Sequence, residues 1–303
     1  MRQLISAIVT MCAMARLLSP LPAFAASPQP GILQMTLASK TVSLGEPIIL
    51  VYKVTNTENR KIGSNINDNP RRWLSISLID QFGHSLTATP AAAQMPLHSG
   101  LAHSQESVID ANGSSTNSVT GSIVVSRTLQ PMYPGQYRIR LSAHQRYYWD
   151  EAPGEPIAVD QDFLLPITVT AKDTQRLHAA AEKFRQAVLH DTNYQLALKA
   201  LFSMHASDSQ SVWQELATDP SLDAFRATEV INELTQVNSI SASNILAEMQ
   251  PVAPERWLRT GLDPLNALEG MRRNAGPTLT QHINQLLVAA GVKLDHVPYG
   301  SVN

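Results

Sequence analysis

The pattern of hydrophobic residues changes near Lys172, and this change constrains the fold more than any other feature of the chain. From residue 31 to residue 171, short runs of alternating apolar and polar residues are separated by turn residues, which is typical of half-buried β-strands. From residue 173 to residue 291, apolar residues recur every three or four positions behind capping residues, which is typical of amphipathic helices. The sequence therefore predicts two successive units, one of strands and one of helices.

The first residues have the pattern of a secretory signal peptide. Arg2 precedes an apolar stretch from Leu4 to Met14, and Ala23-Phe24-Ala25 fits the small-x-small cleavage rule. The apolar stretch is shorter than the about 20 residues that a membrane-spanning helix needs. We therefore expect cleavage after Ala25 (leader 1–25) and a periplasmic or secreted mature protein without a transmembrane segment.

Cys12 is the only cysteine in the chain and falls within the expected leader. The mature protein is therefore expected to have no disulfide bond, no thiolate nucleophile and no cysteine-based zinc site. The precursor has a net charge of -2 at pH 7, whereas nucleic-acid-binding proteins normally show a basic surface. We expect no nucleic-acid role, and a fold stabilised by hydrophobic cores, for which 44% hydrophobic residues are sufficient.

Strand signals recur throughout the first unit. Leu33, Met35 and Leu37 alternate with polar residues, and Ile48 to Val54 is an apolar, β-branched run behind a Gly-Glu-Pro turn. No helical pattern separates the expected strands, so the sequence favours a β-sandwich over an α/β sheet. The strands are expected at residues 33–37, 48–54, 73–79, near 86, at 121–126, 137–143 and 163–170.

Three short phrases, Ser43 to Leu50, Val54-Thr55-Asn56 and Pro134-Gly135-Gln136-Tyr137, resemble the immunoglobulin-like domains that are common in exported bacterial proteins. The resemblance covers about half of the chain and implies a fold, an immunoglobulin-like β-sandwich over residues 31–172, rather than an activity. In such domains a tyrosine at this position hydrogen-bonds back to the backbone. Tyr137 is either such a corner residue or an ordinary strand tyrosine. The cysteine and tryptophan hallmarks of antibody domains are missing.

Capping residues mark the helices of the second unit, an α-helical domain at residues 173–303. An acidic or hydroxyl residue before an apolar stripe is a helix start, and proline is preferred directly behind such a cap. Starts are expected at Asp173 or Thr174, at Tyr194, at Asp219-Pro220, at Asp263-Pro264 and at a capping box of Thr278 and Gln281.

The two Asp-Pro pairs lie 44 residues apart, within the range of HEAT-type helical repeats. Such repeats stack into a long surface for macromolecules. Asp-Pro pairs are also generic helix starts, so an irregular helical bundle is the favoured interpretation and a HEAT-like array is the alternative. In either arrangement we expect Trp213 and Trp257 in the core or between the two units.

The chain lacks the common signatures of catalysis and cofactor binding. The phrase from Gly83 to Thr87 is nearest to a serine-nucleophile turn, but it has no second glycine and falls in an expected hairpin. No two histidines flank a glutamate at zinc-protease spacing, and no phosphate-binding loop pattern occurs. The sequence therefore favours a non-enzymatic protein without cofactor or metal, although catalytic groups that assemble from distant positions leave no such motif.

An aromatic and acidic segment follows the expected strand at residues 137–143. Tyrosine and tryptophan offer a broad contact area at small entropic cost, and they stack on sugars or fill partner pockets. The segment is therefore the candidate binding site, within a long hairpin connection. In the alternative interpretation, which we favour, its rings pack against the helical unit and join the two units. The residues concerned are Tyr147, Tyr148, Trp149, Asp150 and Glu151.

These observations lead to a functional hypothesis of an exported, non-enzymatic interaction or scaffolding protein of the bacterial envelope, with an envelope protein or a glycan as partner. One alternative is a glycan-binding module that uses the aromatic segment. The other is a hydrolase with a site between the two units, which requires histidine and carboxylate groups that converge in one pocket.

Overall fold

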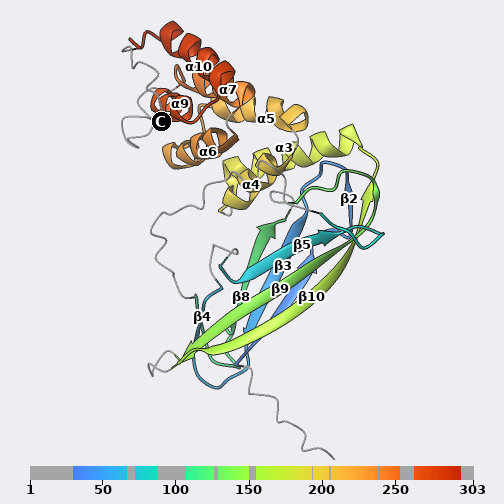
Figure 1. Ribbon diagram of the computed structural model, residues 1–303. Helices are drawn as coiled ribbons and strands as arrows, with labels where there is room; N and C mark the ends of the chain where they lie inside the picture. The colour runs from blue at the N-terminus through green and yellow to red at the C-terminus, as the bar shows by residue number, and fades with distance from the viewer. Residues whose placement is uncertain are drawn as a thin grey trace, which may run out of the picture.

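The computed structural model describes residues 30–66, 72–86, 107–125, 129–149, 155–192, 194–204, 206–237, 239–252 and 263–294. The last strand ends at Thr170 and the helices begin at Thr174, so the change of pattern near Lys172 is a change of structure. In Figure 1 the helices lie beyond one end of the sheets, and strands and helices do not interleave. The expected leader, Asp150, Glu151 and Trp257 lie outside the described residues.

A three-stranded antiparallel sheet contains the first strand of the chain. β1 (Gly31–Leu37) pairs with β3 (Ile49–Asn56), and β3 pairs with β8 (Ser118–Val124). Buried and exposed residues alternate along β1, as the sequence predicts. β1 is therefore an edge strand of this sheet with one face in the core.

A second, seven-stranded sheet is built around one long hairpin. Its two arms are β9 (Gly135–Trp149) and β10 (Ile157–Thr170), which pair antiparallel. Both arms are longer than the predicted strands at 137–143 and 163–170, because neighbouring strands supply partners along their length. These neighbours are β2 (Thr41–Ser43), β4 (Ile62–Ser64), β5 (Leu74–Ile79), β6 (Ser85–Leu86) and β7 (Ser107–Ile109).

The two sheets share one hydrophobic core. Odd-numbered residues of β9 point inward and even-numbered residues point outward, because side chains alternate across a strand. Trp73 is fully buried in this core and meets the ring of Tyr52 edge-on, with ring centroids 5.4 Å apart. Inward residues from both sheets complete the core, among them Leu33, Leu50, Val54, Ile139, Leu141 and Ile167.

Tyr137 closes the start of β9. Its hydroxyl donates a 2.7 Å hydrogen bond to the carbonyl of Tyr133, four residues upstream, and its ring is buried. The bond fixes the chain where it enters the long strand. Of the two interpretations of Tyr137, the structure therefore has the one in which it hydrogen-bonds back to the backbone.

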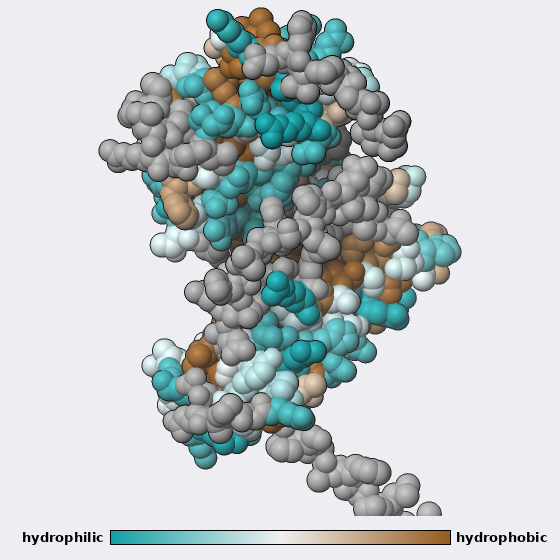
Figure 2. All heavy atoms as spheres, turned by 60° about the vertical axis from the view of Figure 1, so that its left-hand side comes forward, coloured by the Kyte–Doolittle hydropathy of each residue, from teal (hydrophilic) through white to brown (hydrophobic). Residues whose placement is uncertain are grey.

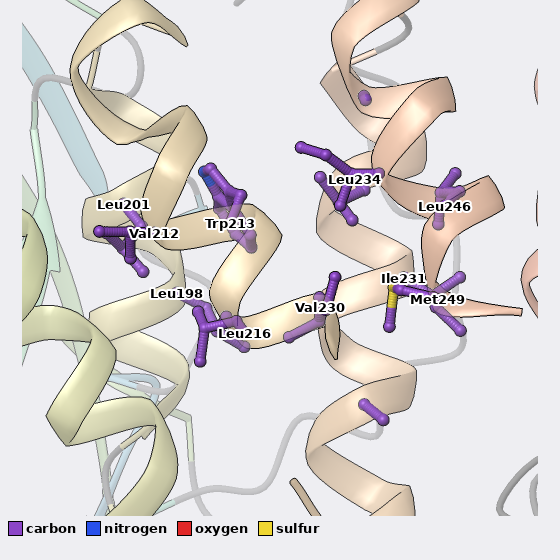
Figure 3. Packing of buried hydrophobic residues seen from close by; sticks show 14 of the residues in the cluster. Leu198, Leu201, Val212, Trp213, Leu216, Val230, Ile231, Leu234, Leu246 and Met249 are labelled. Atoms are coloured by element: carbon purple, nitrogen blue, oxygen red, sulfur yellow. The ribbon is translucent and has the colours of Figure 1, made fainter. Parts of the chain in front are cut away.

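Seven helices are described, and their buried residues form a second hydrophobic cluster that is separate from the core of the sheets. Figure 3 shows Trp213 and Leu216 facing Val230 and Leu234 across this cluster. The core position expected for Trp213 is thus confirmed. The helices are α3 (Thr174–His190), α4 (Tyr194–Ser203), α5 (Ala206–Thr218), α6 (Ala224–Val237), α7 (Ile240–Met249), α9 (Pro264–Arg273) and α10 (Pro277–Ala289).

Three predicted helix starts are confirmed and two are wrong. α4 begins at the expected residue, Tyr194. Asp173 caps α3 and Asp263 caps α9, each by accepting a hydrogen bond from a backbone N–H three residues on. The expected start at Asp219-Pro220 is wrong: Asp219 closes a turn, and Asp223 accepts the N–H bonds at the start of α6. The 44-residue spacing therefore does not relate two helix starts, which removes the basis for the HEAT-like alternative.

The predicted capping box before α10 is also wrong. Pro277 is the first residue of α10 and Gly276 is its N-cap, so Thr278 already lies inside the helix. Proline at this position needs no N–H partner, and its fixed φ suits the first helical turn. The helix therefore starts without a side-chain cap.

The β part (residues 31–170) and the helical part (residues 174–289) are joined by hydrogen bonds at Ser43. This serine is buried at the end of β2, and its hydroxyl donates to the carbonyl of Ala171 at 3.2 Å. The same hydroxyl accepts the backbone N–H of Asp173 at 2.9 Å. One side chain thus holds the end of β10 and the cap of α3 together.

Arg176 adds an ion pair to this junction. Its guanidinium lies 2.7 Å from Glu46 Oε2 and donates to the carbonyl of Thr41 at 2.8 Å. Lys172 and Asp208 form a second pair at 2.8 Å, in which the Asp208 side chain is almost completely buried. Charge-assisted bonds of this kind fix the orientation of the groups that they join. The first helices are therefore held in a defined position against β2.

Candidate binding surface

The aromatic segment lies on a strand rather than in a loop. Tyr147 is opposite Ile157 of β10, and Trp149 is opposite Ile62 of β4. The sequence prediction of a long hairpin connection from residue 146 is therefore wrong for these positions. The strand continues because β4 and β10 satisfy its backbone groups on both sides. Asp150 and Glu151 fall outside the described residues.

Tyr147 is a core residue. Its side chain is 1% exposed and its hydroxyl donates to the side-chain oxygen of Gln145, which is also buried. Removal from water raises the pKa of the Tyr147 hydroxyl well above its ordinary value. The ring is therefore not available for contact with a ligand.

Trp149 is half-buried, and a cation covers one face of its ring. The guanidinium carbon of Arg60 lies 3.3 Å from the ring centroid, which is the geometry of a cation–π contact. Asn56 positions this arginine, because its buried side-chain amide donates a 2.8 Å bond to the carbonyl of Arg60. Tyr148 is half-buried and points to the opposite face of the sheet. Of the three predicted rings, Tyr148 and Trp149 are therefore partly exposed, on opposite faces of the sheet, and Trp149 also packs against the core.

The interpretation in which these rings join the two units is wrong. The helical part meets the β part at β2 and the adjacent start of α3, and α4 lies beside β8. β9 begins at Gly135 near this junction and has 15 residues, so at about 3.3 Å per residue its far end lies about 46 Å away. Figure 1 shows the β4 end of the hairpin at the opposite end of the sheets from the helices.

The outer face of β9 carries a row of exposed charged side chains that the sequence analysis did not single out. Within the described part of the chain, Arg138, Arg140 and Arg146 form no side-chain ion pair. His144 Nδ1 lies 2.9 Å from Asp160 on β10. The signal was present in the sequence, because these residues all occupy even positions of one strand and must share a face.

Acidic side chains line the neighbouring strand. Asp160 faces His144, and Asp162 accepts a 2.6 Å hydrogen bond from the hydroxyl of Ser142. The outer surface of the hairpin is thus basic along β9 and acidic along β10. In Figure 2, which draws another face of the molecule, hydrophilic residues dominate and hydrophobic residues gather in separate patches.

Shifted carboxyl pKa values do not gather in one place among the described residues. The pKa of Asp110 is lowered by hydrogen bonds from Thr116 and Lys61 at the β7 end of the sheet. The pKa of Glu182 is lowered to about 2, chiefly by hydrogen bonds from Arg185 on α3. The described residues also contain no group of three or more histidine, cysteine, aspartate or glutamate side chains placed to hold a metal ion.

None of the helices in the described ranges combines the length and the hydrophobicity that a membrane-spanning segment requires.

No family model matches the chain, and no curated protein matches it. A β-glucosidase from Listeria innocua is 11% identical over 46% of this chain and 16% of that protein, with a TM-score of 0.19. The α-2-macroglobulin of E. coli is 10% identical over 89% of this chain and 22% of that protein, with a TM-score of 0.26. A polysaccharide lyase is 9% identical, with a TM-score of 0.20. The chain thus spans less than a quarter of the first two proteins, and scores at this level assign neither fold nor function.

Proposed function

We propose that the protein is an exported, non-enzymatic binding protein of the bacterial envelope that recognises a partner protein through the β9–β10 hairpin. In this proposal the chain has a leader (residues 1–25), an immunoglobulin-like β-sandwich domain (31–172) and a helical domain (173–303). The observation that carries the proposal is the hairpin itself, which presents three exposed arginines without ion-pair partners among the described residues on one rigid strand.

The immunoglobulin-like assignment is supported by three features. Two sheets share one core, most strand pairs are antiparallel, and Tyr137 hydrogen-bonds back to the carbonyl of Tyr133. In immunoglobulin-like domains a tyrosine makes a bond of this kind at the entry to a strand. Folds of this class serve mainly as scaffolds that hold recognition surfaces.

The helical part supports the proposal by bracing the base of the hairpin. Ser43 ties the start of α3 to the end of β10, and Arg176 ties α3 to β2, which pairs with β10, so the hairpin projects from a fixed base. A preorganised surface loses less conformational entropy when a partner binds. Exposed arginines on such a surface suit a partner with acidic groups, because guanidinium and carboxylate pair in bidentate geometry.

The two alternatives retain fewer of their predicted residues. A glycan site would have only the partly exposed rings of Tyr148 and Trp149, which lie on opposite faces of the sheet, because Tyr147 is buried. A hydrolase site between the two parts would have to use the junction, where the described carboxylates Glu46 and Asp208 are engaged by Arg176 and Lys172. We therefore place binding by the hairpin first.

Binding is tested with purified mature protein immobilised and exposed to an envelope extract. The test variant replaces Arg138, Arg140 and Arg146 by alanine. A matched control replaces Lys53, Lys183 and Arg273, which are exposed away from the hairpin and remove the same charge. We expect the wild type and the control to retain the same partner, and the hairpin variant to lose it. Equal retention by the hairpin variant, or no partner for any protein, would contradict the proposal.

Export is tested separately by cell fractionation and N-terminal sequencing. We expect the protein in the envelope or periplasmic fraction with Ala26 as its first residue, because cleavage follows the small-x-small site. Replacing Ala23 and Ala25 by bulky residues should leave the uncut precursor. Full-length protein in the cytoplasm of wild-type cells is the opposing result.

A further inference from the structure

β10 has an open edge along most of its length. It pairs with β9 from Ile157 to Val169, but β2 covers its other side only from Thr168 to Thr170. In the described part of the chain no other strand pairs with it. Figure 1 shows β10 at the margin of its sheet, with β2 near one end of it. An edge of this kind is a template for another extended chain.

The hydrogen bonds between β10 and the chain around β2 show which backbone groups of β10 point toward the open edge. The N–H of Thr168 donates to the carbonyl of Lys40, and the carbonyl of Thr170 accepts from Leu44, so even-numbered residues face β2. Backbone groups alternate between the two sides of a strand. The free groups toward the open edge therefore belong to Ala158, Asp160, Asp162 and Leu164, and Pro166 has a carbonyl there but no N–H.

The inner side of the same edge is apolar and incompletely covered. Phe163 and Leu165 point into the core but are only partly buried, unlike Ile167, which is 1% exposed beside the β2 contact. On the facing sheet the nearest strand is β1, which is also an edge strand. Apolar side chains from an added strand would bury more of Phe163 and Leu165, which is favourable.

The outer side of the edge disfavours pairing between two copies of this protein. Asp160 and Asp162 would place like charges close together in a symmetric strand pair, and Pro166 removes one donor. Natural edge strands use charged residues and proline to prevent such self-association. The same two carboxylates would favour basic side chains on a different strand. The occupant is therefore a segment of another protein rather than a second copy.

We propose that the open edge of β10 binds an extended segment of the partner protein by strand addition. Every second side chain of this segment is apolar and faces Phe163 and Leu165. The side chains between them are basic and lie beside Asp160 and Asp162. The inference rests on the proposed binding function and adds a second contact to it: acidic groups of the partner pair with the arginines of β9, and a separate extended segment of the same partner, apolar and basic, lies along the edge of β10.

The test uses a fluorescent synthetic peptide of about eight residues, a typical strand length, in which lysine and valine alternate. The wild type should bind it, and Leu164→Pro should weaken binding by about tenfold or more, because it removes an edge N–H and inserts a ring between the strands. This substitution leaves the bonds to β9 intact, since Leu164 faces the open edge. Leu164→Ala keeps the N–H and should change affinity by less than about threefold.

Two peptide controls define the chemistry. A peptide of the same composition with all lysines before all valines should bind weakly, because it cannot place apolar and basic side chains on opposite faces. Replacing lysine by glutamate should abolish binding through repulsion by Asp160 and Asp162. Circular dichroism confirms that each protein variant is folded. No binding to the wild type, or equal binding to Leu164→Pro, overturns the inference.

The envelope-extract experiment separates this inference from the proposed function. If Leu164→Pro retains the envelope partner but the triple arginine variant loses it, strand addition is wrong and binding by the hairpin stands. If the wild type retains no partner, the proposed function fails whatever the peptide does. Loss of the partner by Leu164→Pro, with retention by Leu164→Ala, supports both.

Discussion

The ring of Tyr147 lies directly on the backbone of Gly31, and the two residues come from different sheets. A β-carbon at residue 31 would lie 2.7 Å from Tyr147 Cε1, closer than van der Waals contact allows. Because the ring is fixed in the core, it has little room to move. The glycine is therefore what allows β1 and β9 to approach at this point.

Gly31→Ala should lower the free energy of unfolding by about 1–3 kcal/mol, the usual cost of overpacking a core. Gly270→Ala is the control, since nothing lies within 4 Å of a β-carbon at that position. It should stabilise by about 0.5–1 kcal/mol, because alanine favours a helix over glycine. Urea denaturation measures both. Equal stability of Gly31→Ala and wild type would show that the ring can give way.

Asn56 is completely buried, and its amide group donates to the carbonyls of Arg60 and Asp110, each at 2.8 Å. The same amide donates a buried 3.2 Å bond to the carbonyl of Ile109, so Asn56→Ala should cost about 1–3 kcal/mol in urea denaturation, because a buried carbonyl then loses this donor. Asn65→Ala is the matched control: it loses two hydrogen bonds to β9, but at the exposed surface, where water replaces them. A loss for Asn65→Ala as large as that for Asn56→Ala would contradict this account.

Arg176→Ala should loosen the junction between the two parts. It removes the bonds to Glu46 and Thr41, and a partly exposed ion pair contributes up to about 1 kcal/mol, or about a fivefold change in an equilibrium constant. We expect limited proteolysis near residues 171–173 to accelerate by that factor. Arg185→Ala breaks ion pairs within α3 and between α3 and α5, away from β2, so cleavage near residue 172 should keep its wild-type rate.

The ionisation of Glu182 should make the free energy of unfolding depend on pH. Hydrogen bonds from Arg185 lower its pKa from 4.5 to about 2, so its contribution is complete above pH 4.5 and is lost as the pH falls toward 2. Its side chain is 40% exposed, and solvent screening therefore limits the contribution to less than about 1 kcal/mol. Glu182→Gln should be less stable than wild type at pH 7, and the difference should vanish near pH 2. A difference that is constant with pH would contradict the ion pair.

The sequence predicted those elements whose signals are local. The alternation in β1 and the caps Asp173 and Asp263 each depend on a few adjacent residues, and all three are confirmed. Asp219-Pro220 carries the same local signal, but Asp219 is held in a turn and Asp223 caps the helix instead. A cap motif indicates that a helix can start at a residue. Where two candidate caps lie close together, packing determines which one starts the helix.

The candidate site depended on partners that are distant in the sequence. Tyr147, Tyr148 and Trp149 look like a loop because turn residues follow them, yet pairing with β4, more than 80 positions earlier, extends the strand through Trp149. Burial of Tyr147 likewise depends on Gly31, which no local pattern links to it. The row of charged side chains on β9 follows from the alternation of side chains along a strand. Its full length becomes clear only once the strand is known to reach Trp149.

The bonds around Ser43 join groups 128 and 130 positions apart in the chain. Synthesis runs from the N-terminus, so β2 is made long before the two groups that it must hold. The contacts that set the angle between strands and helices can therefore form only after Asp173 has been made, whereas β1 and β3 have all their partners within the first 124 residues.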